Sequence, residues 1–259
     1  MQTTILMYHM IADPLDSIEA VLCRTPDAFR QDMLQIRQSG YQVVPLASVL
    51  DCIAGKNDLP EKTVAITFDD GLACIYENAL PILQEFGYPS SLFIVSGCVN
   101  GYNEWGKNFG LPRRRMLVSS EIRALAESGM NIGAHTVNHV WLGKSKKDVA
   151  TKEIRDSKAE LEDILGQEVS TFAYPFGDWN QMARNAVIEA GYTGACSTMP
   201  GLNKKNTDPF LLRRAEIKGG DAPWKVRLKL RFATSDMPPR PPIRSTLRKL
   251  FSKKTDESV

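Results

Sequence analysis

Histidine is scarce in this sequence, and several other features are missing. Only three histidines occur among 259 residues. The five cysteines are odd in number and form no C-x-x-C pair, which argues against a disulfide framework and against a zinc–cysteine cluster. No apolar run reaches the ~18 residues that cross a bilayer. No Gly-rich phosphate loop follows the first expected strand, which weakens the case for a doubly wound nucleotide-binding fold.

The first nine residues, Met1 to His9, contain neither a basic segment nor a signal cleavage site. They are typical of a first β-strand rather than of a signal peptide. We therefore expect a cytoplasmic protein. Hydrophobic residues make up 43% of the chain, which is ample for the core of a soluble domain.

Positive charge is concentrated at the C-terminal end. Residues 210–259 carry 13 Lys and Arg against 5 Asp and Glu, whereas the body is mildly acidic. Within 241–254, cations surround an apolar helical face formed by Ile243, Leu247, Leu250 and Phe251. This pattern predicts peripheral association with anionic lipid on the inner membrane face, where a lipid-linked sugar would be the substrate. A solubilising tail and a helix docked on the body are the alternatives. A nucleic-acid partner is not favoured, because no recognition motif accompanies the charge.

Helical and strand patterns alternate along the chain, which predicts a parallel sheet with helices outside. The expected strands are 4–8, 41–44, 63–68, 91–95, 131–134, 171–174 and 192–197. The expected helices are 46–54, 72–86, 119–128, 146–165 and 180–190, besides one that begins at Pro26 and ends at Gly40. We divide the chain into a catalytic domain, 1–220, and a basic extension with helical and proline-rich parts, 221–259.

Three polar motifs follow expected strands. They are Thr67-Phe-Asp-Asp-Gly71, His135-Thr-Val-Asn-His139 and Tyr174-Pro-Phe-Gly177. In a closed parallel barrel, strand ends of this kind form one mouth, where active sites lie. In isolation the first motif predicts a polar turn and the second two surface histidines, but their joint occurrence favours a single site.

One aspartate and two histidines can hold a divalent metal, while the adjacent aspartate stays free as a base. We expect His135 and His139 to reach one ion across a turn of helix. Such a ligand set suits zinc best, and also cobalt, nickel or manganese. The set predicts hydrolysis of an unreactive bond such as an amide.

The three motifs, in this order, closely resemble the polysaccharide deacetylases of the NodB-homology type (carbohydrate esterase family 4). The resemblance spans roughly residues 4–218 and implies a distorted (β/α)7 barrel. It also implies that Asp69 is the general base and that Asp70, His135 and His139 bind the metal.

The third motif is similar to the family pattern R-x-F-x-x-P-[YW]-G. By this resemblance Tyr174, Pro175 and Phe176 contribute to substrate and oxyanion binding, with the backbone N–H of Phe176 on the oxyanion. The sequence departs from the pattern where the base-orienting Arg is expected, because Ser170 stands there. We expect Arg213 or Arg214 to replace it, with surface charge as the alternative.

The histidine that usually supplies the general acid also has no counterpart, since none follows the second motif. Tyr8-His9 ends the first expected strand and resembles the N-terminal Tyr-His of exopolysaccharide deacetylases with rearranged motifs. We assign His9 as the general acid; a buried, supporting histidine is the alternative. The insertion 97–115, which contains Trp105 and Phe109, is expected to be a solvated loop, with a substrate-covering loop as the alternative.

The sequence therefore predicts a metal-dependent hydrolase that removes N-acetyl groups from an amino sugar of a glycan or glycolipid. A small-molecule amidohydrolase or deformylase of the same family is the first alternative. A catalytically inactive glycan-binding module is the second, and the intact Asp69, Asp70, His135 and His139 argue against it.

Overall fold

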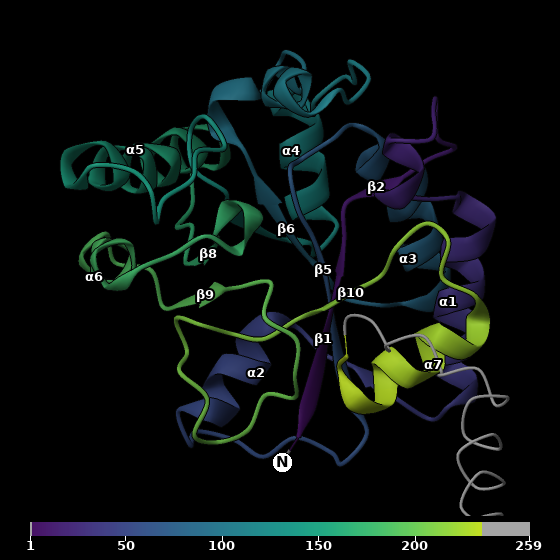
Figure 1. Ribbon diagram of the computed structural model, residues 1–259. Coiled ribbons are helices and arrows are strands. Elements are labelled where there is room, and N and C mark those ends of the chain that lie inside the picture. The colour runs from purple at the N-terminus through teal and green to yellow at the C-terminus, as the bar shows by residue number, and fades with distance from the viewer. Residues whose placement is uncertain (1, 235–259) are drawn as a thin grey trace, which may run out of the picture.

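The computed structural model describes residues 2–234, which form a parallel sheet surrounded by helices (Figure 1). The main path of the sheet runs, in spatial order, through β10 (Ala215–Glu216), β1 (Thr3–Tyr8), β5 (Thr63–Phe68), β6 (Ser91–Ile94), β7 (Asn131–Ala134), β8 (Thr171–Ala173) and β9 (Gly194–Cys196). Every pairing along this path is parallel. A further short strand, β4 (Gln42–Val43), pairs with the beginning of β5.

Between β9 and β10 the ring of strands is joined by a short backbone contact rather than by a full strand pairing. Cys196 forms a parallel bridge with Leu212, whose carbonyl also accepts a hydrogen bond from Ser197 N at 2.8 Å. The chain then enters β10, where Ala215 pairs with Leu6 of β1. The predicted fold class, a distorted (β/α) barrel, is thus confirmed.

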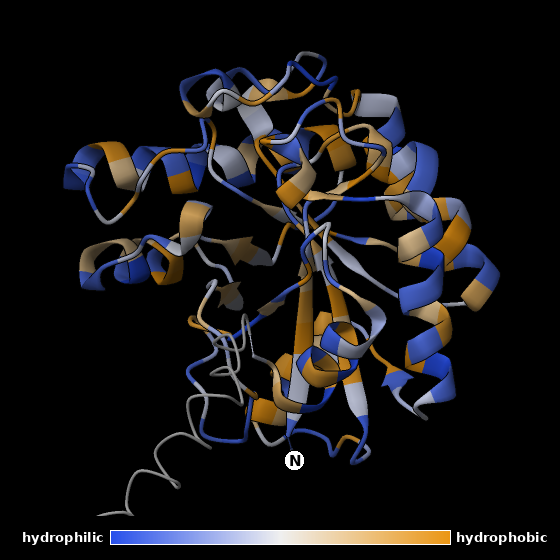
Figure 2. Cartoon of the chain, turned by 45° about the vertical axis from the view of Figure 1, so that its right-hand side comes forward, coloured by the Kyte–Doolittle hydropathy of each residue, from blue (hydrophilic) through white to orange (hydrophobic). Residues whose placement is uncertain are grey.

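Helices cover the outside of the strands. They are α1 (Pro26–Gln38), α2 (Leu46–Ile53), α3 (Leu80–Phe86), α4 (Ser119–Glu127), α5 (Lys147–Leu165), α6 (Gln181–Glu189) and α7 (Pro223–Phe232). In Figure 2 the long central strands are mostly orange, whereas the helices carry orange and blue side by side. All six residues of β5 are buried, as expected for a parallel strand covered on both faces.

The first helix illustrates how the sequence sets these boundaries. Thr25 caps α1 by accepting a hydrogen bond from Ala28 N, and Pro26 occupies the first helical position, where its missing N–H costs nothing. Phe29 and Met33 lie one turn apart and are fully buried against the sheet.

The helix expected at 72–86 is divided into two parts. A π-helical turn, η2 (Ile75–Ala79), precedes α3, and Pro81 lies at the second position of α3. Proline has no N–H to donate to the preceding turn, so a continuous α-helix cannot form across this point.

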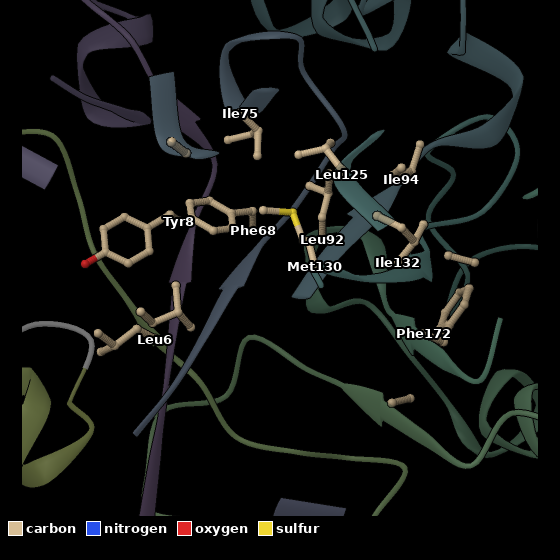
Figure 3. Close-up of a cluster of buried hydrophobic side chains, with 14 of the residues drawn as sticks. Leu6, Tyr8, Phe68, Ile75, Leu92, Ile94, Leu125, Met130, Ile132 and Phe172 are labelled. Carbon is tan, nitrogen blue, oxygen red and sulfur yellow. The ribbon is translucent and has the colours of Figure 1, made fainter. Parts of the chain in front are cut away.

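The largest hydrophobic core lies between the strands and the outer helices. Figure 3 shows the side chains of Phe68, Leu92 and Met130 pointing toward one another, with Leu125 of α4 beside them. These side chains are at most 4% exposed. The core therefore fixes the strands whose ends carry the polar motifs.

The helix α7 belongs to the outer layer of the barrel. The carbonyl of Leu230 accepts hydrogen bonds from Thr4 Oγ1 at 2.8 Å and from Tyr41 OH at 3.2 Å. The part of the predicted extension that the structure describes therefore packs on the barrel. The predicted membrane-binding segment, 241–254, lies outside the described residues. Within residues 2–234, no helix combines the length and the apolar character needed to span a membrane.

Candidate active site

The polar motifs gather where the parallel strands end. β5 ends at Phe68 and is followed at once by Asp69 and Asp70; β7 and β8 are followed by the second and third motifs, and β1 by His9. In Figure 1 β1 runs upward from the N-terminus, so this mouth lies above the sheet. The structure thus brings Asp69, Asp70 and all three histidines to one end of the barrel.

Asp70, His135 and His139 form a compact set of ligand atoms. The distance from Asp70 Oδ1 to Nε2 is 3.3 Å for His139 and 3.7 Å for His135. One ligand atom from each residue lies within 4.8 Å of the others, and all three residues are buried. Two imidazoles and a carboxylate at this separation can share one divalent ion.

The protonation of these residues fits a metal site. His135 Nδ1 lies 2.7 Å from the Ala173 carbonyl, which keeps the proton on Nδ1 and leaves the Nε2 lone pair facing Asp70. Burial lowers the pKa of His135 to about 4, so its ring is neutral near pH 7. Burial alone would raise the pKa of Asp70, but its hydrogen bond with His139 and the surrounding histidines outweigh this and hold the pKa of Asp70 well below its usual range.

The segment between the two histidines is not helical, in contrast to the prediction. It is an irregular loop in which Thr136 and His139 have positive φ, 64° and 55°. The left-handed backbone at these two residues, rather than the spacing of a helical turn, brings both rings to Asp70. Asp70 and Phe176 also have positive φ, 78° and 60°. Each motif therefore contains a backbone conformation that non-glycine residues seldom adopt, as is common at functional sites.

Asp69 forms a buried ion pair with Arg214. Arg214 Nη1 donates to Asp69 Oδ1 at 2.6 Å and Nη2 donates to Oδ2 at 2.7 Å, while Nε donates to the Ser197 carbonyl. Burial raises the pKa of Asp69, yet the charge of Arg214 and its hydrogen bonds to the carboxylate lower it overall, so the carboxylate stays ionised.

Of the two arginines predicted to replace the missing motif residue, only one reaches the base. Arg213 Nη1 instead donates to the Pro200 carbonyl at the surface. Neighbouring residues at a strand entrance point to opposite sides, so Arg214 faces the barrel interior and Arg213 faces away. Of the two alternatives, the structure therefore places Arg214, and not Arg213, beside Asp69.

His9 lies at the same mouth, directly after β1. Its Nδ1 is 4.0 Å from Glu216 Oε1, and its side chain is 17% exposed. A positive charge on His9 would lower the pKa of both Asp69 and Asp70. Its partial exposure leaves the ring accessible to a substrate.

The third motif contributes less than predicted. The Tyr174 ring is buried in the core against Phe172, and burial raises the pKa of its hydroxyl. Its side chain therefore does not line the mouth, because residues next to each other in an extended segment face opposite ways. Pro175 is buried as well. Phe176 does reach the site, with its ring 4.5 Å from that of His139 in an edge-to-face contact.

Aromatic side chains from the insertion 97–115 and from the segment after His139 pack against His139 and Phe176. Trp105, in the short helix η4 (Glu104–Phe109), stacks on the His139 ring at 4.9 Å and 28°. Trp141 stacks on Phe176 at 3.9 Å, and Phe109 lies 5.4 Å from Phe176. The insertion 97–115 is thus not a fully solvated loop. In the sequence, this packing was indicated only by the presence of aromatic residues in an otherwise polar segment.

Comparison with known proteins relates this chain to polysaccharide deacetylases. The family model described as polysaccharide deacetylase matches residues 56–195. The poly-beta-1,6-N-acetyl-D-glucosamine N-deacetylase of Escherichia coli (strain K12) is 30% identical over 218 residues, which cover 72% of this chain and 32% of that protein. The chain therefore spans about a third of that relative. The Bacillus subtilis (strain 168) protein YxkH is 27% identical over 217 residues, covering 83% of this chain and 71% of that protein.

A solved structure has the same architecture. The Streptococcus pyogenes deacetylase PplD, in complex with acetate, superposes with a TM-score of 0.77 at 26% identity, covering 89% of this chain and 98% of that one. The barrel and its mouth are therefore shared with a deacetylase over nearly the whole described chain.

Proposed function

Because the chain belongs to the polysaccharide deacetylase family of hydrolases, we propose that it removes N-acetyl groups from an amino-sugar polysaccharide in a metal-dependent reaction. The proposal is supported by one observation: two adjacent carboxylates lie at the mouth of the barrel, and each has its own set of partners. Asp69 is paired with Arg214, and Asp70 faces His135 and His139. This arrangement supports a base and a metal site side by side as the basis of the proposal.

The substrate class is proposed from the relatives. Similar proteins from Escherichia coli and Staphylococcus aureus are named poly-beta-1,6-N-acetyl-D-glucosamine N-deacetylases. A polymer of β-1,6-linked N-acetylglucosamine is therefore the first substrate to test, and a lipid-linked amino sugar is the second.

In this proposal each residue of the site has a separate role in amide hydrolysis. Asp70, His135 and His139 would hold one divalent ion, for which we propose zinc. Such an ion, when bound, polarises the acetyl carbonyl and favours ionisation of the attacking water. Asp69 takes the proton from that water, and the backbone N–H of Phe176 donates to the oxygen of the tetrahedral intermediate. As the C–N bond breaks, His9 gives a proton to the departing sugar amine, and acetate is released.

Acetate release separates this proposal from its alternatives. We expect the purified protein with zinc to release equal amounts of acetate and free amine from β-1,6-linked N-acetylglucosamine oligomers. Hydrolysis of small formyl or cyclic amides, without action on the oligomers, would indicate the small-molecule amidohydrolase. Oligomer binding without acetate release would indicate an inactive glycan-binding module.

His9→Ala should lower turnover of the acetamido sugar by ~100- to 10,000-fold while leaving the bound metal in place. The reason is that an amine is a poor leaving group unless it is protonated. An activated aryl acetate, whose leaving group needs no proton, provides the internal control and should be hydrolysed at close to the wild-type rate. Near wild-type turnover of the sugar by this variant would place the general acid elsewhere.

Membrane association through 241–254 remains a prediction, because that segment lies outside the described residues. A cytoplasmic location is likewise a prediction. We expect the protein to sediment with anionic vesicles at low salt, and deletion of 241–259 should abolish this binding. Sedimentation that is equal for the full chain and the deletion variant, or absent at low salt, would contradict the prediction.

A further inference from the structure

The loop between the two histidine ligands needs support, because its backbone is strained. Thr136 and His139 have φ values of 64° and 55°. Positive φ is uncommon for residues other than glycine and is a clear outlier for a β-branched residue such as threonine. Such conformations persist only where the surrounding contacts fix them.

One side of the loop is fixed through its carbonyl groups. Ser96 N donates to the Thr136 carbonyl at 3.1 Å, and Gly97 N donates to the Val137 carbonyl at 3.0 Å. Both donors belong to the short helix η3 (Ser96–Cys98), which follows β6. These bonds leave the N–H groups of the loop to be satisfied from elsewhere.

Glu153 of α5 accepts those N–H groups. Its Oε2 accepts from Val137 N at 3.0 Å and from Asn138 N at 2.8 Å, and its Oε1 accepts from Asn138 Nδ2 at 2.7 Å. The residue is only 9% exposed. A carboxylate is costly to bury unless hydrogen bonds compensate it, and here all three donors come from the loop that joins the ligands.

The ring of His139 has polar support on one side only. Its Nε2 faces Asp70, but its Nδ1 is buried and finds no hydrogen-bond partner among the described residues, whereas His135 Nδ1 is held by the Ala173 carbonyl. The orientation of His139 toward Asp70 therefore depends on its backbone and on its aromatic neighbours. The backbone, in turn, is fixed between η3 and Glu153.

We propose that Glu153 is a positioning residue for the metal centre: it holds the 135–139 loop in the left-handed conformation that brings His139 to Asp70. The inference rests on the proposed function, in which these two residues and His135 bind the ion. Glu153 is not one of those ligands. It acts through the backbone of the loop, and its loss should let the loop relax and the two imidazoles separate.

The test measures metal binding rather than activity. Zinc affinity would be determined by competition with a chelator, together with the visible absorption of the cobalt(II) protein and the melting temperature. Glu153→Leu should weaken zinc binding by ~10- to 100-fold and alter the cobalt spectrum, since partners of this kind orient the ligands. Glu153→Gln keeps one acceptor oxygen and should lose affinity to a smaller, measurable extent.

A matched control lies on the same helix. Glu162 accepts a hydrogen bond from the backbone N of Val169, in a loop that carries no ligand. Glu162→Leu should lower the melting temperature without changing zinc affinity or the cobalt spectrum, which separates positioning from general stability.

Wild-type zinc affinity and an unchanged cobalt spectrum in Glu153→Leu would overturn the inference. If that variant does not fold, wild-type affinity in Glu153→Gln would overturn it equally. A wild-type protein that binds no zinc would instead refute the proposed metal site itself, and the two failures are therefore distinguishable.

Discussion

Replacing Arg214 by methionine should reduce both the stability and the turnover of this protein. Arg214 is fully buried and pairs with the Asp69 side chain, which is 4% exposed. Removing one partner leaves a buried carboxylate without compensation, which typically costs roughly 3–5 kcal/mol of unfolding free energy. Denaturant unfolding at pH 7 measures this loss.

The same substitution should change the pH dependence. In the folded wild-type protein the charge of Arg214 helps to hold the pKa of Asp69 below its usual value, against the effect of burial. The pair therefore stabilises the fold above the unfolded-state pKa of aspartate, and that contribution is lost as the pH falls through the folded-state pKa. Without Arg214 the pKa of Asp69 rises, so the acid limb of the activity profile should move to higher pH.

Arg213→Met is the matched control for this prediction. Arg213 is adjacent in sequence but donates to the Pro200 carbonyl at the surface. Its loss should change stability by less than about 0.5 kcal/mol and leave the pH profile in place. Equal behaviour of the two methionine variants would show that Arg214 does not support the base.

Asp69→Asn should abolish most turnover while the protein still binds one metal ion. An amide cannot accept the proton of the attacking water, and general-base catalysis is typically worth ~100- to 10,000-fold. Asp69 is not one of the three grouped ligands, so metal content should persist. Steady-state kinetics with elemental analysis of the same sample test both parts.

The neighbouring Asp70→Asn variant tests the division of roles between the two carboxylates. It should lose both the ion and the activity, because Asp70 Oδ1 faces the Nε2 atoms of both histidines. If Asp69→Asn loses the ion and Asp70→Asn keeps it, the assignment of base and ligand is reversed.

Much of the barrel could be predicted because its signals are local. Apolar runs such as Thr63–Phe68 and helix limits such as Pro26 and Gly40 depend on neighbouring residues alone. An interruption of the α-helix near Pro81 could have been anticipated from the missing N–H of that proline.

The details of the site depend on contacts between distant segments, which one sequence does not reveal. Spacing alone allowed a helical turn between His135 and His139, whereas the actual loop is fixed by Glu153, on another element. The sequence could not show whether Arg213 or Arg214 contacts Asp69, because that depends on which side chain faces the barrel interior. The packing of Trp105 on His139 likewise joins two segments that sequence patterns treat separately.

Deacetylation of an amino-sugar polymer by this protein should depend on one divalent ion held by Asp70, His135 and His139. The direct test is to strip the protein with a chelator, add zinc in fractions of an equivalent, and follow acetate release from β-1,6-linked N-acetylglucosamine oligomers. The account predicts no release from the stripped protein, activity that rises until about one equivalent is bound, and none at any zinc level in His139→Ala. Full activity of the stripped protein, or undiminished activity of His139→Ala, would contradict it.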